Sequence, residues 1–117
     1  MTRLEVERID GVPVAHLRED VDSANFAAIE RRLAESVGPD ALSLIVDLSA
    51  VRYVDSAGVD MLLRLGDRLD QRRNKLILVI PEASPLTRLI KIVGLPEAIA
   101  IHPSLDGALA GQRPDST

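Results

Sequence analysis

The sequence predicts a single α/β domain whose mixed, mostly parallel β-sheet is covered by about four helices. Two observations lead to this prediction. The chain has 117 residues, of which 46% are hydrophobic and 27% charged, and this composition suits one compact domain. Amphipathic helical segments also alternate with short, nearly continuous apolar runs, as in sheets whose parallel strands are buried on both faces. The predicted order of elements is β-β-α-β-α-β-α-β-α.

The first elements are a hairpin and a helix. Leu4 and Val6 are separated by a charged residue, which is the pattern of a half-exposed strand, and Asp10-Gly11 is a strong hairpin signal. A second strand follows over residues 12–17. Four apolar residues then recur at helical spacing: Phe26, Ile29, Leu33 and Val37. Gly38-Pro39 ends this helix.

Two buried strands flank the second helix. The runs 42–48 (LSLIVDL) and 75–80 (KLILVI) are nearly continuous in apolar residues, which predicts central strands. Between them, apolar residues at helical spacing predict a helix that ends near Arg72, Arg73 and Asn74. Cations in the last turn suit the negative end of the helix dipole.

The last third of the chain predicts a helix, a short strand and a short helix. Ser84 as N-cap and Pro85 at the first helical position mark the start of the third helix, and Gly94 marks its end. The apolar face of this helix comprises Leu86, Leu89, Ile90 and Val93. Residues 98–101 predict the last strand, and Ser104 opens the final helix.

The composition excludes several functional classes. The 14 Lys and Arg against 18 Asp and Glu give a net charge of −4, which argues against a nucleic-acid-binding face. The absence of cysteine excludes disulfides, thiol nucleophiles and thiolate metal sites. Met1 leads straight into charged sequence and no apolar run reaches the ~20 residues of a membrane span, so we expect a cytoplasmic protein without membrane insertion. We expect a domain over residues 1–112, a flexible tail at 113–117, and no cofactor or metal.

The most informative segment is 51–63, VRYVDSAGVDMLL, which lies between a buried strand and a helix. Asp55 or Ser56 can cap the free amides of the first helical turn, and the small residues Ala57 and Gly58 leave the backbone approachable. A phosphate on Ser56 would meet the positive end of the helix dipole. Two interpretations stay open at this point: a helix cap alone, or an accessible serine that is modified.

The segment 44–63, LIVDLSAVRYVDSAGVDMLL, resembles the signature of STAS domains, and in particular of the bacterial anti-sigma factor antagonists. In that signature a buried strand ends in Asp, and an aromatic or aliphatic pair, Asp-Ser, a small residue, Gly and a Leu-rich helix follow. Residues 86–110 are similar to the family's third helix, short strand and final helix. The resemblance covers about residues 3–110 and implies a STAS fold.

The resemblance implies a protein-binding function that phosphorylation switches. In the family, the serine of the Asp-Ser pair is phosphorylated by an anti-sigma factor that is itself a serine kinase of the histidine-kinase ATPase fold. The unphosphorylated antagonist binds the anti-sigma factor and frees the sigma factor for transcription. A phosphoserine phosphatase restores this form.

The family's functional residues are carried over by position. Ser56 matches the phospho-acceptor, and Asp55, Ala57 and Gly58 match partner-binding positions around it. Asp22 matches an acidic position at the kinase-facing surface. The sequence departs from the family at two places. The four residues ending at Asp22 read Glu-Asp-Val-Asp instead of Gly-Glu-Leu-Asp, and Ala57 replaces a second serine found in many members.

We expect Ser56 to act through charge. Four residues near it in sequence predict an apolar patch: Val54, Ala57, Val59 and Met61. A phosphate dianion in such a patch would be desolvated on docking or repelled by acids of the partner, at a cost of several kcal/mol. Because ~1.4 kcal/mol is tenfold in affinity, this cost is enough to switch binding.

An enzymatic function is disfavoured. Asp47, near the end of a central strand, has the position of a phospho-accepting aspartate, but the sequence favours an acceptor of hydrogen bonds in the following turn. His16 and His102 have no metal-ligand spacing and are predicted at strand edges, and Tyr53 is predicted to pack beside the motif. The sequence contains no P-loop, Gly-x-Gly-x-x-Gly or Gly-x-Ser-x-Gly motif.

Two alternatives keep the fold and change the partner. Free-standing STAS proteins also resemble small subunits of lipid-transport ABC systems and scaffold components of stress-sensing assemblies. In these interpretations Ser56 is regulatory or only a helix cap. The identity of the protein that binds distinguishes them from the anti-sigma factor antagonist.

Overall fold

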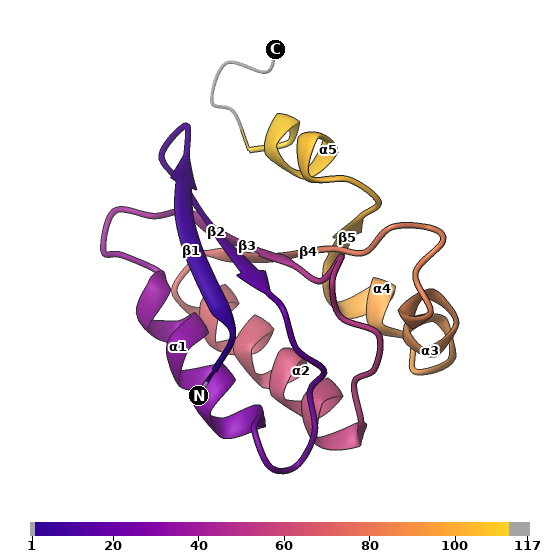
Figure 1. The fold of residues 1–117 in the computed structure, drawn as a ribbon. Coiled ribbons are helices and arrows are strands. Elements are labelled where there is room, and N and C mark those ends of the chain that lie inside the picture. The colour runs from indigo at the N-terminus through magenta and orange to yellow at the C-terminus, as the bar shows by residue number, and fades with distance from the viewer. Residues whose placement is uncertain (1, 113–117) are drawn as a thin grey trace.

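The computed structural model describes residues 2–112 and contains within them five strands and five helices (Figure 1). In chain order these are β1 (Leu4–Ile9), β2 (Val12–Leu17), α1 (Phe26–Ser36), β3 (Ser43–Asp47), α2 (Ser56–Gln71), β4 (Lys75–Val79), α3 (Leu86–Ile92), α4 (Leu95–Ala98), β5 (Ala100–His102) and α5 (Leu105–Ala110). The predicted order is confirmed, with one added short helix. The predicted tail at 113–117 lies outside the described residues.

The strands form one mixed sheet in the order β1-β2-β3-β4-β5. β1 pairs with β2 antiparallel, through the predicted hairpin, and the remaining neighbours pair parallel. Each parallel strand is added on the same side of the one before it, so right-handed crossovers place the connecting helices on one face of the sheet. Figure 1 shows α1 to α4 on this face and α5 on the other.

Two hydrophobic cores lie on the two faces of the sheet. The larger core packs the sheet against α1, α2 and α3, and its fully buried side chains include Ile29, Leu33, Leu65 and Leu86. The smaller core lies under α5 and comprises Val14, Ile45, Ile77, Val79, Ala108 and Leu109. Burial on both faces explains why the central strands are nearly continuous in apolar residues.

The last third differs from the prediction in one element. Ala98 ends α4 instead of opening the last strand, which begins at Ala100. The cause is Gly94, whose φ of 71° ends α3 in the left-handed region and lets the chain turn directly into a second short helix. The buried side chain of Leu95 anchors this helix to the core. The helix α3 begins at Leu86 with Pro85 as its N-cap, one residue later than predicted, and the Oγ of Ser84 accepts the N–H of Leu86 at 3.1 Å.

His16 is not at a strand edge, as the sequence suggested, but in the interior strand β2. Its Nδ1 lies 2.8 Å from Oδ2 of Asp47 on β3, and its Nε2 lies 2.5 Å from Oε2 of Glu7 on β1. Asp47 has its predicted role in the following turn, because its Oδ1 accepts the N–H and the hydroxyl of Ser49. His102 does lie on an edge strand, β5.

Among the residues that the structure describes, none forms a helix both long and apolar enough to span a bilayer.

Candidate functional site

The start of α2 displays Ser56 to solvent. Asp55 is the N-cap: its Oδ1 accepts the N–H of Gly58 at 3.0 Å, and its carbonyl oxygen accepts the N–H of Val59 at 2.9 Å. The sequence allowed either Asp55 or Ser56 as the cap, and the structure shows that it is Asp55. Ser56 is the first residue of the helix and is exposed.

Two loops distant in sequence meet in front of α2. Val21 and Val54 form an isolated parallel bridge, in which the N–H of Val21 donates to the carbonyl of Tyr53 and the N–H of Asp55 donates to the carbonyl of Val21, both at 3.0 Å. The bridge places the acidic stretch before α1 directly beside the Asp-Ser motif. Because the pairing is parallel, the two loops run in the same direction, from Val21 to Asp22 and from Val54 to Asp55.

Asp20 strengthens this junction. Its Oδ1 accepts the backbone N–H of Arg52 at 2.9 Å and of Tyr53 at 3.1 Å. In the sequence this residue is only one of the four that end at Asp22, and no local pattern pairs it with an amide 32 residues away. Asp20 thus holds the backbone that leads into the cap of α2.

Asp22 is also held in place. Its Oδ1 accepts the N–H of Ala24 at 2.8 Å and of Asn25 at 3.2 Å, and its own N–H donates to Oδ1 of Asn25 at 2.9 Å. The side chain is exposed at the turn that precedes α1. The structure therefore brings Asp22, Asp55 and Ser56 to one edge of the domain, although Asp22 is more than 30 residues away in the chain.

Gly58 is not approachable, contrary to the interpretation of the sequence. It is buried beneath the bridge, and a Cβ at this position would lie 2.5 Å from Cγ1 of Val54 and 2.7 Å from Cγ1 of Val21. Glycine is required here because α2 packs its first turn directly against both valines. Ala57 is partly buried beside it.

The apolar surroundings of Ser56 differ from the predicted patch. Met61 is completely buried, and Val54 and Val59 retain only a small exposed fraction. A groove of about 360 Å³ instead opens between α2 and α3, and its lining comprises Val54, Asp55, Ser56, Val59, Asp60, Leu63, Leu89 and Val93. Val93 was expected on the buried face of the third helix, but it is 43% exposed, since Leu86 and Ile90 make the core contacts of α3.

Tyr53 is the functional candidate that sequence reasoning missed. It was expected to pack beside the motif, but its side chain is 57% exposed. The chain has only one tyrosine and one phenylalanine, so an exposed aromatic residue three positions before Ser56 is an unusual use of this scarce type. One signal in the sequence could have indicated this exposure. Tyr53 lies between Arg52 and the Asp-Ser motif, in a segment without helical or strand periodicity.

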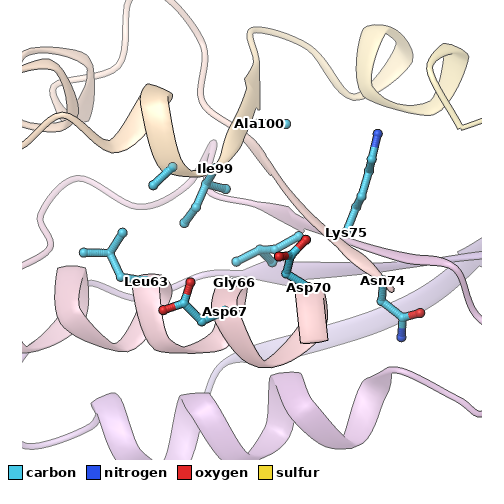
Figure 2. A pocket seen from close by; sticks show the side chains of 10 residues that line it. Leu63, Gly66, Asp67, Asp70, Asn74, Lys75, Ile99 and Ala100 are labelled. Atoms are coloured by element: carbon cyan, nitrogen blue, oxygen red, sulfur yellow. The ribbon is translucent and has the colours of Figure 1, made fainter. Parts of the chain in front are cut away.

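A second cavity, of about 270 Å³, lies toward the other end of α2. Figure 2 shows Asp67 and Asp70 projecting from α2 near Ile99, while the side chain of Lys75 extends away from both acids. Carboxylates on an exposed helix face are the usual solvated surface of a small domain. The cavity is therefore a weaker candidate than the edge that carries Ser56.

Removing the Asp20 carboxylate tests the junction. We expect Asp20→Ala to lower the free energy of unfolding by about 1 kcal/mol, because two backbone N–H groups lose a charged acceptor at an exposed site. Urea denaturation measures this loss. Asp67→Ala is the matched control, since it removes an exposed acid from α2; equal unfolding midpoints for the two variants would contradict the role of Asp20.

Comparison with known proteins agrees with this architecture. The sequence model of the STAS domain matches residues 3–108, which is nearly the whole described chain. The chain belongs to the STAS domain family.

Individual relatives are anti-sigma factor antagonists. The chain is 29% identical over 104 residues to the anti-sigma-F factor antagonist RsfB of Mycobacterium tuberculosis, a match that covers 89% of this chain and 84% of RsfB. It is 27% identical to an anti-sigma factor antagonist of Mycobacterium paratuberculosis, with a TM-score of 0.78 and coverage of 95% and 93%. The fold also matches the phosphorylated form of the Bacillus cell fate determinant SpoIIAA, at 17% identity, a TM-score of 0.68 and coverage of 94% and 99%.

Proposed function

We propose that this protein is an anti-sigma factor antagonist that binds an anti-sigma factor when Ser56 is unphosphorylated and releases it when Ser56 carries a phosphate. The observation that carries the proposal is the exposed Ser56 at the first position of a capped 16-residue helix, with Asp22 held beside it. The names of the relatives support the partner, and the phosphorylated form of SpoIIAA supports the modification.

The partner in this proposal is a serine kinase of the histidine-kinase ATPase fold, and a phosphoserine phosphatase reverses its action in the cytoplasm. The antagonist thereby regulates transcription by binding, without catalysis of its own. Asp22, Asp55 and Ala57 are the residues that we propose to contact the partner around Ser56. Gly58 contributes indirectly, because it lets α2 approach the Val21–Val54 bridge.

The switch has a simple physical basis. Phosphorylation adds about 1.5 to 2 negative charges at Ser56, next to the carboxylates of Asp55 and Asp60. The helix N-terminus tolerates this charge in the free protein, because the phosphate faces the positive end of the dipole and remains hydrated. A docked partner removes that hydration, and the cost of desolvating a dianion exceeds the tenfold step of ~1.4 kcal/mol.

A pull-down from the source organism identifies the partner. We expect immobilised wild-type protein to retain a small kinase of the ATPase fold, and Ser56→Asp to lose it, with mass spectrometry as the readout. An ABC ATPase that both proteins retain equally would contradict the proposal and favour the transport-subunit alternative. Ser56 would then have no switching role and would serve only as part of the first helical turn.

Calorimetric titration with the purified kinase measures the switch. We expect Ser56→Asp to weaken binding at least tenfold, Ser56→Ala to retain wild-type affinity, and both to keep the wild-type melting temperature, since Asp suits the first turn of a helix. Ser104→Asp is the matched control, because Ser104 caps α5 on the opposite face and Asp also caps helices. Equal affinities for wild type and Ser56→Asp would disprove the switch.

A further inference from the structure

Tyr53 combines an exposed side chain with a backbone fixed on both sides. Its N–H donates to Oδ1 of Asp20 at 3.1 Å, and its carbonyl accepts the N–H of Val21 at 3.0 Å. The next residue, Val54, is 4% exposed and bridges Val21 in the sheet-like pairing. The aromatic ring thus projects from a loop segment whose backbone is held by hydrogen bonds to Asp20 and Val21.

The exposure of this ring has no structural explanation. A phenol ring left in water forgoes the stabilisation that burial of such a large side chain provides. The core is complete without it, since the neighbours Val51 and Val54 fill the space beneath the loop. An exposed aromatic side chain three residues before the exposed Ser56 is therefore available to a binding partner.

Fixed aromatic residues are the usual energetic centres of protein interfaces. Tyrosine is enriched among residues that dominate binding energy, because it offers a large apolar area with a polar tip and few rotatable bonds. Little further entropy is lost on binding when the backbone is already fixed, as it is here by Asp20 and Val21. Both features apply to Tyr53.

We propose that Tyr53 is the main anchor of the interface with the anti-sigma factor, and that Asp20 is the residue that positions it. The inference rests on the proposed function and assigns two residues that the family resemblance did not. The partner surface that fits is an apolar depression with a polar rim, which accepts the ring and hydrogen-bonds the hydroxyl. Ser56 then decides whether the interface forms, and Tyr53 supplies much of its affinity.

The test is a double-mutant cycle measured by calorimetric titration with the purified kinase from the pull-down. We expect Tyr53→Ala to weaken binding about 30-fold or more and Tyr53→Phe to stay within about threefold of wild type. Asp20→Ala should weaken binding three- to tenfold in the wild-type background and have little further effect on Tyr53→Ala. This non-additivity separates positioning from a general loss of stability, which would lower both affinities alike.

Leu42→Ala is the matched control. Leu42 is a large apolar side chain that is 78% exposed, and it lies in the loop directly before β3, remote from Ser56. Wild-type affinity for Tyr53→Ala, or a loss equal to that of Leu42→Ala, would overturn the inference while leaving the Ser56 switch intact. Failure of the wild-type protein to bind the kinase would instead overturn the proposed function and the inference with it. Self-association of the wild type that Tyr53→Ala abolishes, seen by sedimentation, would assign the ring to a second copy of this chain and also overturn the inference.

Discussion

Gly58→Ala is expected to lower the free energy of unfolding by about 1–3 kcal/mol, because the added methyl group overpacks the start of α2. The new Cβ would lie 2.5 Å and 2.7 Å from the Cγ1 atoms of Val54 and Val21, which is closer than carbon atoms approach without displacement. Either α2 or the bridge between the two loops must move. Urea denaturation followed by circular dichroism measures the loss.

The same helix contains a matched control. A Cβ at Gly66 would meet its nearest neighbour, Cγ1 of Ile99, at 3.5 Å, which is ordinary van der Waals contact. Gly66→Ala should therefore stabilise the protein by up to ~1 kcal/mol through helix propensity alone. The same change in the free energy of unfolding for Gly58→Ala and Gly66→Ala would contradict the prediction, because it would show that the bridge region accommodates the methyl group freely.

A compensating variant locates the strain. Val54→Ala removes the methyl groups that the new Cβ would meet first, so the pair Gly58→Ala with Val54→Ala should be more stable than the sum of the single changes predicts. Amide chemical shifts of Asp55 and Ser56 should return toward wild-type values in the pair. Additive losses would place the strain elsewhere in the first turn.

His16→Gln is expected to lower stability by about 1–2 kcal/mol near pH 6 and to change its pH dependence. Burial opposes the charge on the imidazole, but hydrogen bonds and charges from Asp47 and Glu7 outweigh it and raise the pKa of His16 above its usual value. Burial likewise opposes the charge on Asp47, but hydrogen bonds from Ser49 and the His16 contact lower its pKa. Both ring nitrogens lie against carboxylate oxygens, so in its protonated form the ring donates to both carboxylates and links three neighbouring strands.

The sign of the pH dependence follows from these directions. A raised pKa for His16 means that its contribution is complete below the unfolded pKa of about 6.5 and is lost as pH rises through the folded value. A lowered pKa for Asp47 means that its contribution is present above the unfolded pKa of about 3.9 and is lost as pH falls through the folded value. Both contributions therefore coexist between about pH 4 and pH 6.5.

Denaturant titrations from pH 5 to pH 9 test this prediction. Wild-type stability should fall over the alkaline part of this range by more than that of His16→Gln, because only the wild type loses an imidazolium there. Asp47→Asn should also reduce the alkaline loss, since it removes a carboxylate that favours the charged ring. Parallel curves for wild type and His16→Gln would contradict the prediction, because they would show that the pKa of His16 is the same in the folded and unfolded protein.

The elements were predictable because their signals are local. The Asp10-Gly11 turn, the apolar run 42–48 and the glycine at Gly94 that ends a helix each act within a few residues. The structure has a turn, a buried strand and a helix end at these places. The errors arose where packing overrides local pattern. Val93 has the helical spacing of a core residue, but α3 satisfies its core contacts with other side chains and leaves Val93 at a groove.

The candidate site was predictable only in part. Its serine and cap lie next to each other in the chain, so the helix start revealed both. The sequence predicted an approachable Gly58 and a packed Tyr53, and both predictions were wrong. Each depends on where the loop before α1 lies in the folded protein. The hydrogen bonds of Asp20 were invisible to sequence patterns for the same reason.

Short segments are enough to predict the α/β class, the order of the main elements and the position of Ser56 at a helix start, because hydrophobic periodicity, turns and caps are local properties. The surroundings of that serine follow instead from contacts between distant segments. The Val21–Val54 bridge joins loops separated by about 30 residues and brings Asp22 to the motif, while strand pairing assigns His16 its two carboxylates. These contacts depend on how the crossover connections pack against the sheet, which no local segment encodes.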